Sequence, residues 1–162
     1  MNKQEVYDFI KNKGIDCEIN EHKAVFKFEE VSNTESLYPG YDTKNLLVRD
    51  DKKQNYYLIT IKGNKRVDLK EFRSKYETRA LSFAKEDELK AILNLTFGNV
   101  NPFGLLNDND LKVTFCLDKE FLDKKDIIGI PPNDNTATVW LKVSDLLSII
   151  KEHGNPIKIV EL

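Results

Sequence analysis

Apolar residues recur along this chain in two patterns, the three-to-four-residue spacing of an amphipathic helix and the continuous or alternating runs of a strand. Helical spacing at Val6, Phe9 and Ile10, followed by Gly14, predicts a short helix at the start of the chain. Further helices are predicted at 28–37, 69–76, 85–93 and 144–153. Strands are predicted at 17–20, 24–28, 45–49, 56–61, 80–83, 111–117, 127–130, 136–143 and 157–160.

Turn and cap residues separate these elements. The polar run 50–55 predicts a hairpin between two apolar strands, and the last strand is expected at a sheet edge. Asp68 with Glu71 is typical of a capping box, Ser144 is expected to cap the last helix, and Gly154 to end it. Because the elements follow one another without a linker or an internal repeat, residues 1–162 are predicted to form a single α+β domain. Its one mixed, mainly antiparallel β-sheet is expected to be surrounded by helices.

The composition, 162 residues with 40% hydrophobic and 32% charged side chains, is typical of a folded domain and excludes fibrous and disordered classes. The longest uncharged stretch, 91–107, is interrupted by glycine and proline, so no membrane helix is expected. The N-terminal residues lack the apolar core of a signal peptide, which predicts a cytoplasmic protein. Cys17 and Cys116 have no spacing typical of a zinc site, so we expect no bound metal.

Charge is unevenly distributed, although the net charge is only −2. Residues 62–79 contain seven Lys and Arg against three Asp and Glu. This segment is a candidate phosphate-binding surface, and it is also typical of an ordinary solvated helix face.

The sequence offers few candidates for covalent catalysis. It has no Gly-x-Ser-x-Gly elbow, and its two histidines, His22 and His153, are expected at the surface. Walker A and dinucleotide-binding fingerprints are absent as well. A triad hydrolase and a nucleotide hydrolase are therefore not indicated, and no cofactor is expected.

Two polar loops remain as candidate sites. In the first, 98–108, Gly98 and Gly104 permit close backbone approach, and Pro102 fixes φ, so backbone groups are available to a ligand. The second, 131–138, offers amide, carboxylate and hydroxyl groups for a small polar ligand. A turn whose Asn and Asp side chains bond their own backbone is the alternative interpretation of the second loop.

Six segments in order along the chain resemble the YbaK/ProX family of aminoacyl-tRNA deacylases, and within it the free-standing prolyl-tRNA editing proteins. These segments are KNLL (44–47), YYL (56–58), KRVDL (65–69), LSFA (81–84), GNVNPFGL (98–105) and PNDNTAT (132–138). The likeness covers nearly the whole chain without large gaps, which makes it more specific than any single motif. The fold it implies is that of the synthetase-associated editing domain.

The resemblance implies hydrolysis of mischarged Ala-tRNA(Pro), with the tRNA acceptor end as partner and prolyl-tRNA synthetase as a transient one. Alanine is smaller than proline, so a synthetic site that holds proline cannot exclude it, and a second sieve must remove the error. Deacylation of Cys-tRNA(Pro) or of another small aminoacyl-tRNA is an alternative. A non-catalytic tRNA-binding or regulatory module of the same fold is another.

The family motifs also imply residue roles. Lys44, Gly98 and Gly104 are the expected catalytic residues, with Lys44 acting as a point charge toward the terminal nucleotide. The expected substrate-binding residues are Pro102, Phe103, Asn107, Asn133, Asp134 and Thr136. The tRNA-binding residues would be Lys62, Lys65, Arg66, Lys70 and Arg73. In one departure, Pro131 stands where many relatives have histidine, so the pocket has no imidazole at that position.

Overall fold

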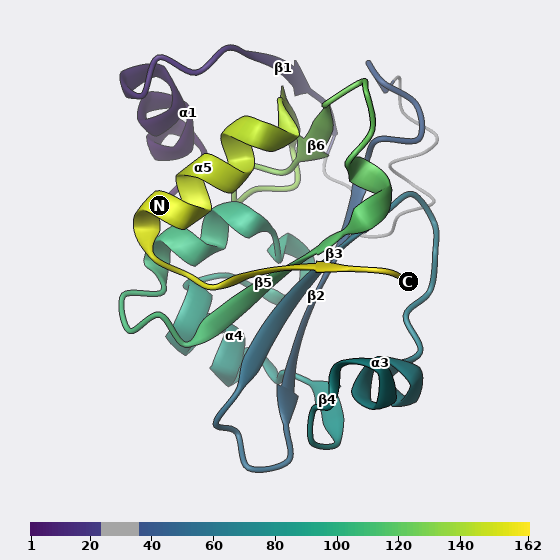
Figure 1. Cartoon of the computed structure of the whole chain (residues 1–162). Coiled ribbons are helices and arrows are strands. Elements are labelled where there is room, and N and C mark those ends of the chain that lie inside the picture. Colours follow the sequence, from purple (N-terminus) through teal and green to yellow (C-terminus); the bar gives the residue numbers. More distant parts are fainter. Residues whose placement is uncertain (24–35) are drawn as a thin grey trace.

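A five-stranded sheet forms the centre of the molecule (Figure 1). In the computed structural model, which describes residues 1–23 and 36–162, its strands are β2 (Thr43–Asp50), β3 (Tyr56–Lys62), β4 (Leu81–Phe83), β5 (Val113–Asp118) and β8 (Ile157–Val160). Their order in the sheet is β4-β2-β3-β5-β8. β2 pairs antiparallel with β3 and β4, whereas β5 is parallel to β3 and β8. The predicted hairpin and the edge position of the last strand are confirmed.

A second sheet lies beside the first. Its strands β1 (Cys17–Glu21), β6 (Ile128–Ile130) and β7 (Ala137–Leu141) are antiparallel in the order β1-β7-β6. The predicted α+β class with mainly antiparallel pairing is confirmed, but the prediction of one sheet is wrong. Among the described residues, an isolated bridge between Asp42 and Gly129 and a hydrogen bond from Thr43 Oγ1 to Gly129 O (2.9 Å) link β2 to β6. Because the bridge is isolated, the hydrogen-bond ladder of the large sheet does not continue into β6, and the two sheets are separate.

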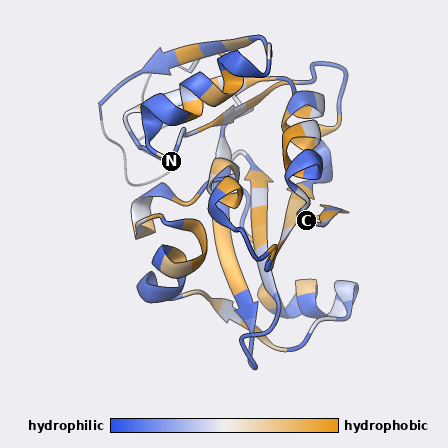
Figure 2. Ribbon diagram, turned by 90° about the vertical axis from the view of Figure 1, so that its left-hand side faces the viewer, coloured by the Kyte–Doolittle hydropathy of each residue, from blue (hydrophilic) through white to orange (hydrophobic). Residues whose placement is uncertain are grey.

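Helices cover both faces of the large sheet. On one face α1 (Lys3–Asn12), α4 (Glu86–Leu93) and α5 (Val143–His153) contribute to the larger core, which also contains Leu47 of β2 and Val139 of β7. On the other face α3 (Leu69–Tyr76) packs Phe72 in a smaller core with Val48 and Ile61. Figure 2 shows apolar residues concentrated along the central strands, because both faces of these strands are covered and successive side chains point to opposite faces.

The helix ends agree with the predictions except at two caps. Asp68 caps α3 by accepting hydrogen bonds from the backbone N–H of Lys70 (3.0 Å) and Glu71 (3.2 Å). The predicted capping box is incomplete, because within the described residues the Glu71 side chain does not accept a hydrogen bond from Asp68 N. Ser144 does not cap α5, because α5 begins at Val143. Its hydroxyl donates instead to Asp126 Oδ2 (2.9 Å).

Two of the predicted elements fall on residues outside the described part of the chain. These are the strand at 24–28 and most of the helix at 28–37, of which Ser36 and Leu37 are described and are not helical. Across the described ranges, no helix combines the length and the apolar character needed to cross a membrane.

Candidate active site

The loop between α4 and β5 folds as two short 3-10 helices, η1 (Phe97–Asn99) and η2 (Pro102–Asn107). Gly98 is exposed in η1, whereas Pro102 and Phe103 are buried. Pro102 occupies the first position of η2, where its fixed φ suits the turn. At this position a backbone N–H would have no partner within the helix, so proline costs no hydrogen bond. The loop thus presents backbone at Gly98 to the surface and is anchored in the core by η2.

Close packing explains the second glycine of this loop. A Cβ on Gly104 would lie 2.5 Å from Leu95 Cδ1, so the backbone of η2 approaches Leu95 only because the side chain is absent. Asn107 ends η2 and donates from Nδ2 to Leu93 O (2.7 Å), and its Oδ1 accepts from the amino group of Met1 (3.1 Å). Gly104 and Asn107 therefore hold η2 in place, and the backbone at Gly104 is buried.

Asn101 joins the two loops that the sequence singles out. Its side chain is fully buried, its Oδ1 accepts from Phe103 N (2.8 Å), and its Nδ2 donates to Asn99 O (2.8 Å) and to Asn133 Oδ1 (2.9 Å). Asn133 has φ of +60°, a left-handed conformation that asparagine tolerates well. This arrangement fixes the position of the 131–136 loop against the Gly98 to Pro102 segment.

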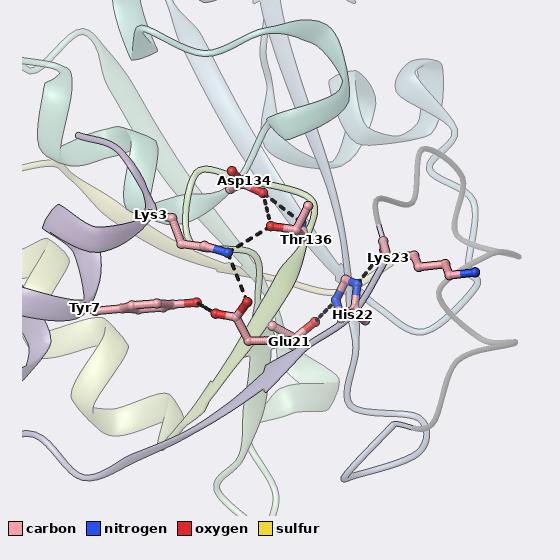
Figure 3. A network of polar contacts seen from close by, with 8 residues as sticks. Lys3, Tyr7, Glu21, His22, Lys23, Asp134 and Thr136 are labelled. Atoms are coloured by element: carbon pink, nitrogen blue, oxygen red, sulfur yellow. Dashed lines mark hydrogen bonds and ion pairs between the residues drawn. The ribbon is translucent and has the colours of Figure 1, made fainter.

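A polar network holds the other side of the 131–136 loop (Figure 3). Asp134 Oδ1 accepts hydrogen bonds from Thr136 N (2.8 Å) and from the Thr136 hydroxyl. Lys3 of α1 donates from Nζ to Thr136 Oγ1 and to Glu21 Oε2, both at 3.1 Å, and Tyr7 donates its hydroxyl to Glu21 Oε1 (3.0 Å). Lys3 therefore connects the loop to the first helix, and the Thr136 hydroxyl donates to Asp134.

The ionisation of Asp134 makes the stability of this loop depend on pH. The Thr136 hydroxyl holds the pKa of Asp134 below its ordinary value, against the opposing effect of burial. A depressed pKa contributes stability above the unfolded-state pKa of about 3.9, and this stability is lost as the pH falls through the folded-state pKa.

We expect wild type to lose more free energy of unfolding than Asp134→Asn when the pH falls from about 5 to about 2. Urea denaturation at a series of pH values measures the difference. Asp110→Asn, a change at an exposed loop carboxylate, is the matched control. Parallel pH profiles for wild type and Asp134→Asn would show that the Thr136 contact does not stabilise the charged form.

Lys44 lies near the start of β2, in register with Ile61 of β3. Its side chain is half-buried, and no residue of the described ranges 1–23 and 36–162 pairs with its ammonium group. Strand alternation places it on the same face as Leu46 and Val48, which belong to the smaller core beneath α3. Phe103 belongs to the larger core on the opposite face. The fold thus directs Lys44 toward the α3 face rather than toward η2.

The fold divides the basic segment 62–79 into paired and unpaired cations. Lys65 Nζ lies 2.7 Å from Asp118 Oδ2 and 3.1 Å from Glu120 Oε1, so its charge is neutralised within the protein. Lys62 Nζ lies 4.1 Å from the centroid of the Tyr41 ring. Within the described residues, the candidates that are exposed and have no partner are Arg66, Lys70 and Arg73.

Sequence reasoning did not select three residues that position these loops. Asn101 precedes a proline, a pattern typical of a turn, and this signal was available in the sequence. Lys3 carried no local signal. His22, expected at the surface, is half-buried. Its Nε2 lies 3.1 Å from Thr138 Oγ1, and its backbone N–H donates to Thr136 O (2.9 Å). Pro131 directly follows β6 and is also half-buried.

The described side chains include no group of three or more His, Cys, Asp and Glu residues that could hold a metal ion. Cys17 and Cys116 are free, and burial raises the pKa of the Cys116 thiol to about 12, which leaves it protonated and unreactive at neutral pH. Among the described residues, the groups available at the site are backbone amides, side-chain amides, hydroxyls, carboxylates and ammonium groups.

Comparison with known proteins connects this fold to a function. The model of the aminoacyl-tRNA editing domain matches residues 22–149. The chain is 38% identical over 160 residues to the prolyl-tRNA editing protein ProX of Acetoanaerobium sticklandii, covering 99% of this chain and 97% of that protein. It is 31% identical over 144 residues to prolyl-tRNA synthetase associated domain-containing protein 1 of Mus musculus, covering 87% of this chain and 85% of the relative.

A solved structure supports the fold itself. A protein described as a candidate trans-editing enzyme for prolyl tRNA synthetase matches with a TM-score of 0.75 at 18% identity, covering 99% of this chain and 95% of that one. Fold and sequence together define the class of aminoacyl-tRNA editing domains. The chain belongs to this family, the YbaK/ProX deacylases that its sequence resembles, and is a hydrolase of aminoacyl-tRNA.

Proposed function

We propose that the protein is a free-standing proofreading enzyme that hydrolyses Ala-tRNA(Pro) to alanine and free tRNA. The observation that carries the proposal is the 38% identity over 160 residues to a prolyl-tRNA editing protein. The contact between Asn101 and Asn133 supports it, because it joins the two loops that the family motifs identify. The proposed deacylase domain spans residues 1–162, acts in the cytoplasm, and meets prolyl-tRNA synthetase transiently.

The reaction needs no covalent intermediate, because an aminoacyl ester is already activated. Water adds to the carbonyl carbon, the bond from that carbon to the ribose oxygen breaks, and the ribose oxygen takes a proton. Backbone N–H groups around Gly98 are proposed to stabilise the developing oxyanion. The ribose hydroxyl next to the ester is proposed to help orient the water.

The selecting pocket is proposed to take its shape from the buried residues Pro102 and Phe103. Asn107, Asn133, Asp134 and Thr136 bond within the protein, so they are proposed to fix the pocket walls rather than to react. A pocket that admits alanine and excludes proline by size would hydrolyse the mischarged tRNA and spare the correctly charged one.

The α3 face is proposed to receive the tRNA acceptor end. Lys44 points to this face, and Arg66, Lys70 and Arg73 are exposed on or beside α3. Lysine and arginine contacts to phosphates give weak binding that depends on salt. Lys65 contributes less than expected from the sequence, because Asp118 already pairs with it.

Deacylation of labelled Ala-tRNA(Pro), Pro-tRNA(Pro) and Cys-tRNA(Pro) by the wild-type protein tests the proposal. Rapid release of alanine, with the proline ester at least about 100-fold slower, is expected of a sieve that excludes the larger side chain. Faster hydrolysis of the cysteine ester would assign the enzyme to that substrate and overturn the alanine preference. Failure to hydrolyse any of the three esters, with tRNA binding retained, would identify a non-catalytic tRNA-binding module.

A further inference from the structure

Tyrosine rings and lysine ammonium groups alternate in a row beside the start of β2. Lys125 Nζ lies 5.5 Å from the centroid of the Tyr38 ring and 4.8 Å from that of the Tyr41 ring. Lys62 Nζ lies 4.1 Å from the Tyr41 ring. The row of Tyr38, Lys125, Tyr41 and Lys62, here called the tyrosine-lysine row, brings together residues from three separate parts of the sequence.

Hydrogen bonds at the phenol oxygens hold the rings in place. Tyr41 donates its hydroxyl to Asp123 Oδ2 (2.7 Å), and Tyr38 donates its hydroxyl to Glu18. A turn connects the two tyrosines, with Tyr41 N donating to Tyr38 O (3.1 Å), and Tyr41 O accepts from Gly129 N (3.0 Å). The phenol edges are thus tied to the protein, and the ring faces meet the lysines.

The row has the chemistry of a site for single-stranded nucleic acid. Such sites combine cations that bind phosphates with aromatic rings on which bases stack. Both Tyr38 and Tyr41 are partly exposed, and Lys125 is exposed. The carboxylates nearby, Asp123 and Glu18, each accept from a tyrosine hydroxyl, so they neutralise the lysines less than a direct ion pair would. A duplex cannot stack its bases on these rings, whereas an unpaired strand can.

The position of the row fits this partner. Lys62 is in register with Thr43, so strand alternation places its side chain on the face of the sheet opposite to Lys44, the face that carries η2. Tyr41 is followed by Asp42, whose bridge to Gly129 joins β2 to the strand that leads into the 131–136 loop. A strand that crosses the row is therefore directed toward the 131–136 loop.

We propose that the tyrosine-lysine row binds the unpaired 3′ end of the tRNA. Lys62 and Lys125 turn from the Tyr41 ring to phosphates, and a base stacks on the ring where they lay. This inference rests on the proposed function, since it names the surface that guides the substrate to the site. It adds Tyr38, Tyr41 and Lys125 to the residues that contact RNA.

Binding of a short, 5′-labelled, single-stranded RNA, measured by fluorescence anisotropy over a salt series, tests the proposal. Tyr41→Leu is expected to weaken binding by about 10-fold or more, because base stacking is lost, whereas Tyr41→Phe keeps the ring and is expected to bind nearly as wild type. Lys62→Gln and Lys125→Gln are each expected to weaken binding and to reduce the slope of log Kd against log salt by about 0.7. Lys90→Gln, on the exposed side of α4, is the control, and thermal midpoints establish that each variant is folded.

The outcomes separate this inference from the proposed function. Equal RNA binding by wild type, Tyr41→Leu and Lys125→Gln, with all three folded, would overturn the row as an RNA site even if Ala-tRNA(Pro) is deacylated. Equal weakening of single-stranded and duplex RNA would also overturn it, since it would indicate a general phosphate surface. If the wild-type protein does not deacylate Ala-tRNA(Pro) but the variants lose RNA binding as expected, the proposed function is wrong and the RNA site is retained.

Discussion

Replacement of Lys44 by alanine is expected to lower kcat/KM for Ala-tRNA(Pro) by about 10- to 100-fold, the loss typical of removing one charged contact, here to the bound terminal nucleotide, of about 1.5–3 kcal/mol. The reason is electrostatic: Lys44 is half-buried, and within the described part of the chain its ammonium group has no protein partner, so its charge is available to the substrate. Among residues 1–23 and 36–162, its removal breaks no ion pair. We therefore expect the thermal midpoint to stay within a few degrees of wild type.

Steady-state deacylation of Ala-tRNA(Pro), beside thermal unfolding of each variant, measures the Lys44 effect. Lys44→Arg keeps the charge and is expected to retain part of the activity, because a planar guanidinium replaces a compact ammonium. Lys90→Ala, at an exposed lysine on α4, is the control for loss of surface charge. Wild-type activity in a folded Lys44→Ala protein would remove this lysine from the reaction.

Replacement of Asn101 by alanine is the second change with a large expected effect. It leaves the backbone N–H of Phe103 and the amide oxygen of Asn133 without their partners, and Asn101 is completely buried. Unsatisfied buried polar groups of this kind cost about 1–3 kcal/mol each, so we expect the free energy of unfolding to fall by about 3 kcal/mol. Deacylation at a temperature where the variant is folded is expected to fall further, because the two loops are no longer held together.

A double-mutant cycle isolates the contact between the loops. Asn133→Gly removes the second side chain at a residue with φ of +60°, where glycine introduces no strain. A coupling energy of about 0.5 kcal/mol or more between Asn101→Ala and Asn133→Gly is expected from urea denaturation. Asn109→Ala, at an exposed asparagine of the same region, is the matched control. Strict additivity of the two changes would show that the loops are positioned independently.

Local sequence patterns predicted the elements of this fold better than their assembly. Apolar runs placed β2 and β3 within two residues of their observed ends, and Asp68 predicted the start of α3, because strand alternation and capping are local properties. The division into two sheets was not predicted. It depends on a bridge between Asp42 and Gly129, and no local pattern encodes a contact across such a sequence separation.

The same distinction holds for the site. Glycine and proline identified the 98–108 loop, and amide, carboxylate and hydroxyl side chains identified the 131–138 loop. Their connection depends on pairs far apart in sequence: Asn101 with Asn133, 32 residues away, and Lys3 with Thr136, 133 residues away. Single-residue chemistry does not reveal such pairs, and for this reason Asn101 and Lys3 were found only in the structure.

The larger core contains residues of both sheets, among them Leu58 and Phe115 from the five-stranded sheet and Ile128 and Val139 from the three-stranded sheet. Because protein interiors are closely packed, movement of one sheet against the other would disrupt this shared core, and the two sheets are expected to melt cooperatively. To distinguish alanine from the larger proline, a pocket must not expand when the larger side chain enters it. We therefore expect the rigidity that the shared core gives to the attached loops to contribute to the proposed selection of alanine over proline.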